Sequence, residues 1–403
     1  MMAKAKFKFT TIIQRFLPLA IKQGGLSAHQ IAMLKLISIC KTAALGGHKE
    51  RCDQCIFSKV HFNSCGNRNC PNCQGINKEK WIYDRQFDLL PVKYFHAVFT
   101  VPEQLRVLFL YNKVSLYKLL SSSAQQTMLQ FGKDPRQKMM AKIGGISILH
   151  TWNQRLEYHP HLHMIVPAGG VNKKGQWVNS RGKDNFLFHV KALSIVFKSK
   201  FMEGVHKLFM NGDLNLPPDW NVNKYYKCKN VLYKLSWNVY AKRAFGGPEQ
   251  VLEYLARYTH KIAISNYRIL AISDTHVTFR YADRKAKKIS TRTVTGEEFI
   301  KLFARHILPK GFVKIRHFGF LASRVKRKYL SQARKCLNAP TPPPKAKLTS
   351  RQFLILTTGK DPYQCPCCEK GEMVVIKIIP AIRGSPCKIP MRFLAADRKV
   401  SLS

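Results

Sequence analysis

Two cysteine pairs near the N-terminus constrain the fold of this chain more than any other feature. Cys52 and Cys55 are separated by two residues, and Cys70 and Cys73 repeat that spacing after a gap of fourteen residues. Two tight turns with this spacing can bring four thiolates around one tetrahedral ion, usually zinc. Four reduced, unliganded thiols are the alternative. The pattern favours one structural zinc site made of Cys52, Cys55, Cys70 and Cys73, whose role is folding rather than chemistry.

The other cysteines and one histidine leave the number of zinc ions open. His48 and Cys65 are close enough in sequence to replace a ligand or to serve a second ion. Cys365 and Cys368 form another pair near the C-terminus, where Cys387 is a candidate third ligand and a fourth is not evident, so zinc and free thiols are both open there. The twelve cysteines occur without a convincing secretory signal, so disulfides are not expected.

The charge of the chain predicts a polyanionic partner. Its 403 residues include 68 Lys and Arg against 22 Asp and Glu, a formal net charge of +46. Such a charge repels itself unless phosphates neutralise it, and it attracts nucleic acid to the protein surface. An anionic membrane is the competing partner. No apolar run reaches the roughly 18 to 20 residues of a membrane span, however, and Gln14 and Arg15 interrupt the apolar stretch 9–21.

The hydrophobic periodicity predicts a mixture of helices and strands. Helices are expected where apolar residues recur at helical spacing, and strands where β-branched and aromatic residues cluster. The expected helices are 27–41, a region ending near 131, 191–210 and 297–306. The expected strands are 94–101, 145–151, 159–166, 231–242, a hairpin at 266–272 and 276–281, and a further strand at 288–294. The segment 338–347 contains three consecutive prolines and is expected to be an extended linker.

A His-x-His pair in one expected strand is a candidate metal site. His161 and His163 are two residues apart, so strand periodicity places both imidazoles on one face while Leu162 points into the apolar layer. Two neighbouring imidazoles are a suitable pair of ligands for a divalent metal. A structural role for two satisfied histidines is the alternative reading of so short a motif.

A tyrosine pair lies on an expected helix farther along the chain. Pro248 follows two glycines and is suited to the first turn of a helix. On that helix Tyr254 and Tyr258 are four residues apart, so both phenols lie on the same face. Taken alone, two tyrosines at this spacing are read as packing residues. Together with the histidine strand and the basic charge, they become candidate nucleophiles.

Basic residues are dense in the second half of the chain. A run of charges is usually a solvated face, but so one-sided a run favours contact with phosphates, and the interleaved aromatic residues could stack on unpaired bases. The candidate DNA-binding residues are Lys242, Arg257, Arg284, Lys287, Lys288, Arg316, Arg324, Lys326 and Arg327.

Taken together, the His161-Leu-His163 strand and the Tyr254-x3-Tyr258 helix resemble the paired-tyrosine HUH endonucleases, and the whole chain is similar to bacterial rolling-circle transposases of the family named for insertion sequence 91. Other matching stretches run from the cysteine pairs at 52–73 to the Cys-Pro-Cys-Cys sequence at 365–368. One departure is Asn69, where the family usually has a histidine before the third zinc cysteine. That departure argues against a histidine ligand at this point.

The resemblance implies an α+β fold with an HUH core, in which helices flank a central antiparallel sheet, and a small N-terminal zinc-binding domain. The implied division is a helical and zinc-binding DNA-docking domain at 1–85, a nuclease domain at 90–335 and a proline-rich linker at 336–348. A small cysteine-containing segment follows at 349–403. The implied location is the bacterial cytoplasm, in association with the nucleoid.

The resemblance also implies the chemistry. His161 and His163 would hold Mg²⁺ or Mn²⁺ against a DNA phosphate, and His260 and Glu253 are candidates for a third ligand. Tyr254 and Tyr258 would attack single-stranded DNA at the ends of an insertion sequence and form 5′-phosphotyrosine bonds. The DNA partners would be single-stranded and duplex DNA at transposon ends and target. A rolling-circle replication initiator or relaxase, a metal hydrolase and a non-catalytic zinc protein that binds nucleic acid are the alternatives.

Overall fold

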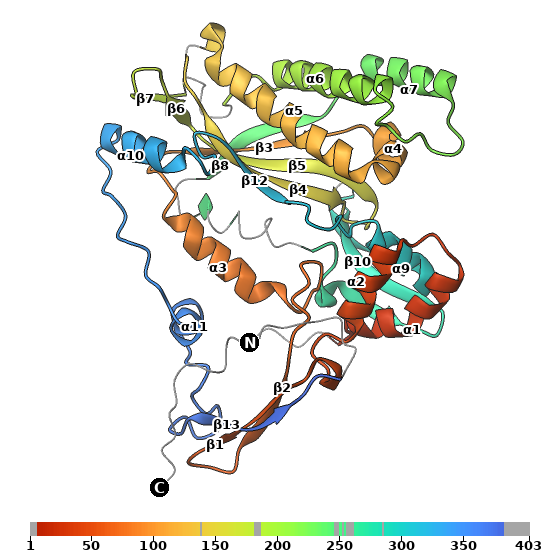
Figure 1. Cartoon of the computed structure of the whole chain (residues 1–403), viewed down its shortest axis with the longest axis vertical. Helices are drawn as coiled ribbons and strands as arrows, with labels where there is room; N and C mark the ends of the chain where they lie inside the picture. Colours follow the sequence, from red (N-terminus) through yellow and green to blue (C-terminus); the bar gives the residue numbers. More distant parts are fainter. Residues whose placement is uncertain are drawn as a thin grey trace.

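The computed structural model describes residues 6–137, 139–180, 187–245, 250–251, 254, 262–283 and 286–382 (Figure 1). At its centre is a five-stranded antiparallel sheet, and the α+β class expected from the sequence is confirmed. The strand order is β12–β4–β5–β3–β8. The strands are β3 (Tyr94–Thr100), β4 (Gly144–Trp152), β5 (Tyr158–Pro167), β8 (Val239–Phe245) and β12 (Ile315–Gly319).

Helices cover one face of this sheet. Figure 1 shows α4 (Arg106–Tyr111), α5 (Lys113–Lys133), α6 (Val190–Met210) and α7 (Val222–Lys234) above it. Strand alternation sends Leu162, Met164 and Val166 of β5 toward these helices, where they join the largest apolar core of the protein. The intervening residues of β5, which include His161 and His163, therefore face the other side of the sheet.

One expected strand is shorter than the sequence suggested. Residues 231–234 close helix α7, which begins where the side chain of Asn221 accepts a hydrogen bond from the backbone N–H of Lys224. The strand β8 begins only at Val239. The expectation of a strand over 231–242 is therefore wrong in its first half, because Tyr225 and Leu232 pack as the buried side of a helix.

A second layer combines the first two helices with a three-stranded hairpin sheet. The elements are α1 (Phe9–Lys22), α2 (Ala28–Ser38), β9 (Ile269–Ile272), β10 (His276–Asp283), β11 (Lys288–Thr295) and α9 (Gly296–Ala304). A capping box between Ser27 and Gln30 begins α2 at the position expected from the sequence. The rings of Phe9 and Phe303 lie 4.3 Å apart between α1 and α9, so the N-terminal helices share a core with residues almost 300 positions later.

A third, small sheet joins the two ends of the chain. It contains β1 (Gly47–Cys52), β2 (Ser58–Phe62) and β13 (Met373–Ile379), with β1 in the middle. Residues 339–349 adopt neither helix nor strand, as expected for the linker, and they lead from α10 to α11 (Figure 1). The remaining helices are α3 (Gln74–Gln86), α10 (Lys326–Cys336) and α11 (Ser350–Thr358), and a two-stranded pair is formed by β6 (Gly169–Val171) and β7 (Trp177–Asn179). Short 3₁₀ turns are Ala43–Leu45, Glu103–Leu105, Pro135–Gln137 and Asn266–Arg268.

Among the helices that the structure describes, none combines the length and the apolar character that crossing a bilayer would require.

His306, just after α9, makes the fold sensitive to acid. Burial, with a smaller contribution from the charges of Lys113 and Arg305, lowers the pKa of His306 to about 3. The unfolded chain binds a proton below pH 6.5, whereas the buried ring stays neutral down to about 3, so stability falls as the pH drops through this window. The expected loss at pH 5.5 is about 1.4 kcal/mol. Urea unfolding of the protein and of His306→Gln at pH 7.5 and 5.5 tests this, because the variant should lose less stability than the natural chain.

Candidate active site and zinc centres

Three histidines meet on the face of the central sheet opposite α5 and α6. They are His150 of β4 and His161 and His163 of β5, and one ring nitrogen of each lies within 4.8 Å of the others. Nε2 of His161 and Nε2 of His163 are 3.1 Å apart. Nδ1 of His161 lies 2.7 Å from the carbonyl oxygen of His159, a contact that holds the proton on Nδ1 and leaves Nε2 to bind a metal. Three converging imidazole nitrogens suit a divalent cation.

His150 was not identified from the sequence. The strand that contains it was expected, but the third ligand was sought near the tyrosines, at His260 or Glu253, and both lie outside the described residues. The pairing of β4 with β5 places His150 directly opposite His161. The only sign of this ligand in the sequence is a histidine in a neighbouring expected strand. That sign identifies a ligand only when the register of the two strands is known.

A fourth histidine connects this group to Tyr254. Nε2 of His96, in β3, lies 2.9 Å from Nδ1 of His163, and the two rings stack with centroids 5.2 Å apart. The hydroxyl oxygen of Tyr254 lies 2.9 Å from both ring nitrogens of His96. His96 therefore orients the ring of His163 and contacts one expected nucleophile. The sequence predicted a strand around His96 but no role for its side chain.

The tyrosine helix is described only in part. Gln250, Val251 and Tyr254 are helical, and Val251 is fully buried against the histidine-bearing face of the sheet. Tyr254 is half-buried and packs against the same apolar group. Tyr258 lies outside the described residues, so its place beside Tyr254 stays a prediction.

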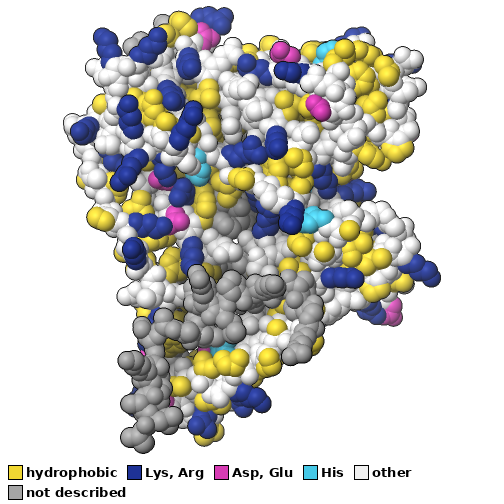
Figure 2. All heavy atoms as spheres, viewed as in Figure 1, with side chains coloured by type: hydrophobic (Ala, Val, Ile, Leu, Met, Phe, Trp, Pro, Cys, Tyr) yellow, Lys and Arg dark blue, Asp and Glu magenta, His cyan; other side chains and the backbone are white. Residues whose placement is uncertain are grey.

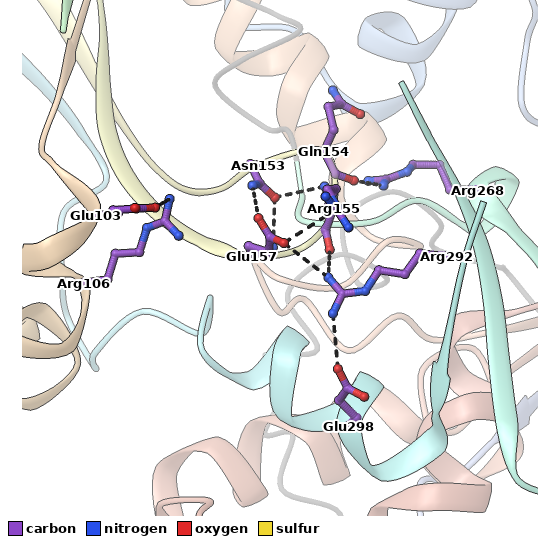
Figure 3. A network of polar contacts seen from close by, with 9 residues as sticks. All are labelled: Glu103, Arg106, Asn153, Gln154, Arg155, Glu157, Arg268, Arg292 and Glu298. Atoms are coloured by element: carbon purple, nitrogen blue, oxygen red, sulfur yellow. Dashed lines mark hydrogen bonds and ion pairs between the residues drawn. The ribbon is translucent and has the colours of Figure 1, made fainter. Parts of the chain in front are cut away.

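The turn that joins the two histidine strands is tied to the hairpin sheet by a polar network (Figure 3). Arg292 of β11 donates to the carbonyl oxygen of Arg155 and pairs with Glu298 at 3.2 Å. Arg268 donates to the carbonyl oxygen of Gln154. Within the turn, Asn153 donates to the carboxylate of Glu157 at 2.7 Å. These contacts fix the end of the β4–β5 hairpin next to His150 and His161, which favours a rigid histidine group.

The first cysteine cluster contains Cys40, Cys65, Cys70 and Cys73, whose sulfur atoms all lie within 4.8 Å of one another. Sγ of Cys73 is 3.3 Å from Sγ of Cys40 and 3.6 Å from Sγ of Cys65. The thiol of Cys40 holds the pKa of Cys73 well below its usual range. A tetrahedral zinc site with bonds of about 2.3 Å has sulfur atoms about 3.8 Å apart, so the cluster has the ligands and approximate size of a closed zinc site.

The second cluster contains Cys52, Cys55, Cys365 and Cys368. Sγ of Cys52 lies 3.7 Å from Sγ of Cys368, and Sγ of Cys55 lies 3.6 Å from Sγ of Cys365. Backbone N–H groups point at these sulfurs, and the N–H of Gly371 lowers the pKa of Cys368 to about 6. The thiolate is the form that binds zinc.

These clusters correct the predicted grouping of the zinc ligands. The two N-terminal pairs do not share one ion, because β1 and β2 carry Cys52 and Cys55 to the C-terminal pair, whereas Cys70 and Cys73 turn back to Cys40. Cys65 belongs to the first cluster, and the Cys52–Cys55 pair completes the cluster that contains Cys365 and Cys368. His48 instead contacts Glu50 at 2.9 Å. Cys387 lies outside the described residues.

The predicted DNA-binding cations are spread over several elements. Lys287, in the turn before β11, and Lys288, its first residue, are exposed, as are Arg324, just before α10, and Arg327, in its first turn. Lys326 is different, because it pairs with Asp88 at 2.8 Å.

Arg316 of β12 lies over the ring of Phe312. Lys242 is opposite His96 in the sheet, although the structure describes only its backbone, and Arg257 and Arg284 lie outside the described residues. Figure 2 shows Lys and Arg side chains over much of one face of the molecule.

Comparisons with known proteins agree with this arrangement. A family model described as "Putative transposase" matches residues 144–329, and one described as "Transposase zinc-binding domain" matches residues 12–101. The "Putative transposase y4qJ" of Sinorhizobium fredii (strain NBRC 101917 / NGR234) is 40% identical over 371 residues, which are 90% of this chain and 92% of the relative. The "Transposase for insertion sequence element IS801" of Pseudomonas savastanoi pv. phaseolicola is 27% identical over 361 residues, 86% of this chain and 84% of that relative.

Among solved structures, a conjugative relaxase, TrwC, in a metal-bound complex with OriT DNA is similar at a TM-score of 0.22, with 10% identity over 40% of this chain and 69% of that one. A likeness at this score carries no argument. One family model covers the N-terminal cysteines, the other covers His150, His161 and His163, and the first relative matches nearly the whole chain. The chain therefore belongs to the transposase family named for insertion sequence 91.

Proposed function

We propose that this transposase cuts and rejoins single-stranded DNA at the ends of an insertion sequence, with Tyr254 and Tyr258 as the nucleophiles. The observation that carries the proposal is the chain of contacts from Tyr254 through His96 to His163, which joins a phenol to the candidate metal site. This work would take place on bacterial DNA in the cytoplasm, at the nucleoid. Single-stranded DNA at the ends and duplex DNA at the target would be its partners.

The three histidines fit a catalytic cation, Mg²⁺ or Mn²⁺. Their nitrogens converge, and the carbonyl contact of His161 leaves its Nε2 directed toward Nε2 of His163. A bound cation would make the scissile phosphate more electrophilic and neutralise charge that develops on its oxygens. His96 keeps the ring of His163 oriented from the other side. The two cysteine clusters would each hold structural zinc.

The tyrosines supply the covalent step. The phenol oxygen of Tyr254 attacks phosphorus and gives up its proton, while the bond from phosphorus to the 3′ oxygen breaks and that oxygen takes up a proton. The products are a 5′-phosphotyrosine and a free 3′-hydroxyl. Since the energy of the phosphodiester is kept in the new bond, a 3′-hydroxyl of another strand can reverse the step without a nucleotide cofactor. With Tyr258 as a second nucleophile, the protein can hold two strands at once, as rolling-circle transfer requires.

A covalent-adduct assay tests this function. A labelled single-stranded oligonucleotide that carries the element's end, incubated with the protein and Mn²⁺, should give a protein–DNA adduct that survives denaturant. Phe at both Tyr254 and Tyr258 should abolish the adduct, because the phenol oxygen is the attacking atom. Tyr233→Phe is the matched control, since Tyr233 is an exposed tyrosine of α7, on the other face of the central sheet. If the doubly substituted protein forms as much adduct as the natural protein, Tyr254 and Tyr258 are not the nucleophiles.

A further inference from the structure

A cavity of about 240 Å³ lies next to the histidine group. Thr151 and Trp152, at the end of β4, form one part of its lining. Arg68, Asn69 and Asn77, which lie close in sequence to Cys70 and Cys73, form another part. Lys314, just before β12, also lines the cavity. The cavity thus lies between the zinc-binding segment and the edge of the nuclease sheet.

The strand β4 links the cavity to the histidine group, because Leu149, Thr151 and Trp152 line the cavity and His150 lies between them. A register shift between β4 and β5 falls between His150 and Trp152, and it leaves the two rings side by side. Their rings stack with centroids 4.8 Å apart and an angle of 17° between the planes. A strand of DNA whose phosphate is held at the three histidines would therefore have a neighbouring nucleotide at the cavity.

The charge of the cavity suits an anion. Nζ of Lys314 lies 5.3 Å from the centre of the Trp152 ring, and the guanidinium of Arg68 donates to the carbonyl oxygens of Phe312 and Pro309 in the loop that leads to Lys314. These contacts hold two cations close together. Burial, together with repulsion from Arg68, lowers the pKa of Lys314 to about 7. An anion between them would offset that repulsion.

The polar lining suits a nucleobase. The amide nitrogen of Asn69 donates to the side chain of Asn67, which fixes the orientation of the Asn69 side chain. Asn77 is exposed on α3 at the rim. Asparagine amides can pair with donors and acceptors on a base edge. The volume is below the roughly 300–1,000 Å³ of sites for drug-sized ligands, so it suits one nucleotide rather than a longer segment.

We propose that this cavity binds one unpaired nucleotide next to the scissile phosphate, with its phosphate against Lys314 and Arg68 and its base between Asn69 and Asn77. The site deepens the proposed function and rests on it, because it assigns one nucleotide of the same DNA strand to a place in the protein. It also gives the zinc-binding segment a direct part in recognising the strand that is cut.

Lys314→Met tests the cation of this site. Methionine keeps the length and apolar character of the side chain, so the melting temperature should not fall. Binding of the single-stranded oligonucleotide that carries the element's end, measured by fluorescence anisotropy, should weaken about tenfold, as expected for a lost charged contact. Lys310→Met is the matched control, because Lys310 is exposed in the same loop, and it should change the affinity at most about twofold.

Asn77→Glu tests the cavity without disturbing buried residues. A carboxylate at the rim should repel the phosphate and weaken binding by about threefold or more. Ile76→Glu adds the same charge one residue earlier on α3, at an exposed position that does not line the cavity. It should therefore have the smaller effect.

A phosphate scan identifies the nucleotide that is bound. One phosphate of the oligonucleotide at a time is replaced by an uncharged methylphosphonate. One position should weaken binding to the natural protein and have no further effect on Lys314→Met. The binding measurement does not depend on cleavage. A missing covalent adduct would therefore overturn the proposed function without changing the result of the phosphate scan. If Lys314→Met binds like Lys310→Met, and Asn77→Glu like Ile76→Glu, the cavity is not a nucleotide site.

Discussion

Serine at both Cys365 and Cys368 should halve the zinc content and release the C-terminal segment from the small N-terminal sheet. The second cluster takes two ligands from each end of the chain, and Cys55 and Cys365 are 310 positions apart. Without β13, the strands β1 and β2 form only a two-stranded hairpin, which is marginally stable by itself. Structural zinc contributes roughly 10–16 kcal/mol in small zinc-binding peptides, so a large local loss of structure is expected.

Zinc analysis and limited proteolysis measure this effect. The zinc content should fall from two ions per chain, one for each four-cysteine cluster, to one. Trypsin should then cut after lysines of the linker, such as Lys345 and Lys347, far more rapidly. Serine at both Cys336 and Cys367 is the matched control, because both cysteines are exposed and belong to neither cluster. Unchanged zinc content in the Cys365 and Cys368 variant would contradict the ligand set.

The same ligands show what the sequence could and could not predict. The short spacings of Cys52 with Cys55 and of Cys70 with Cys73 identified zinc ligands, because two such residues share one turn. Which pairs share an ion depends on strand pairing between distant segments, and that pairing has no local signal. Cys40 shows the limit most clearly, since it has no cysteine close by in sequence and joins its cluster only through the packing of α2.

The histidine site likewise combines residues that the sequence could predict with residues that it could not. The alternation in β5 was sufficient to place His161 and His163 on one face, and the expected strands β3, β4 and β5 are confirmed. Local alternation alone could not show that His150 lies opposite His161 or that His96 lies beside His163, because both depend on the register between strands. The role of the aromatic and basic residues near Trp152 likewise could not be predicted from local sequence, because it depends on the packing of the zinc-binding segment beside them.

Replacing His150 by Gln should reduce formation of the covalent adduct by about two to three orders of magnitude and leave DNA binding nearly unchanged. Glutamine has a similar size but does not offer the imidazole nitrogen that His150 presents to His161 and His163. A divalent cation would then be held by two imidazoles, and its stabilisation of the phosphate, which amounts to several kcal/mol, would be largely lost. Adduct yield against Mn²⁺ concentration measures the effect, and part of the activity should return at high Mn²⁺.

His206→Gln is the matched control, because His206 lies in α6 on the opposite side of the central sheet. Oligonucleotide binding, measured without added Mg²⁺ or Mn²⁺, should be the same for both variants and the natural protein, since the three histidines act on the phosphate only with a cation bound. The two results together separate a metal ligand from a residue that merely packs in the sheet. A full adduct yield from His150→Gln at unchanged Mn²⁺ would instead favour a third ligand from the tyrosine helix, where His260 and Glu253 were expected, and His150 would then be a structural neighbour of the site.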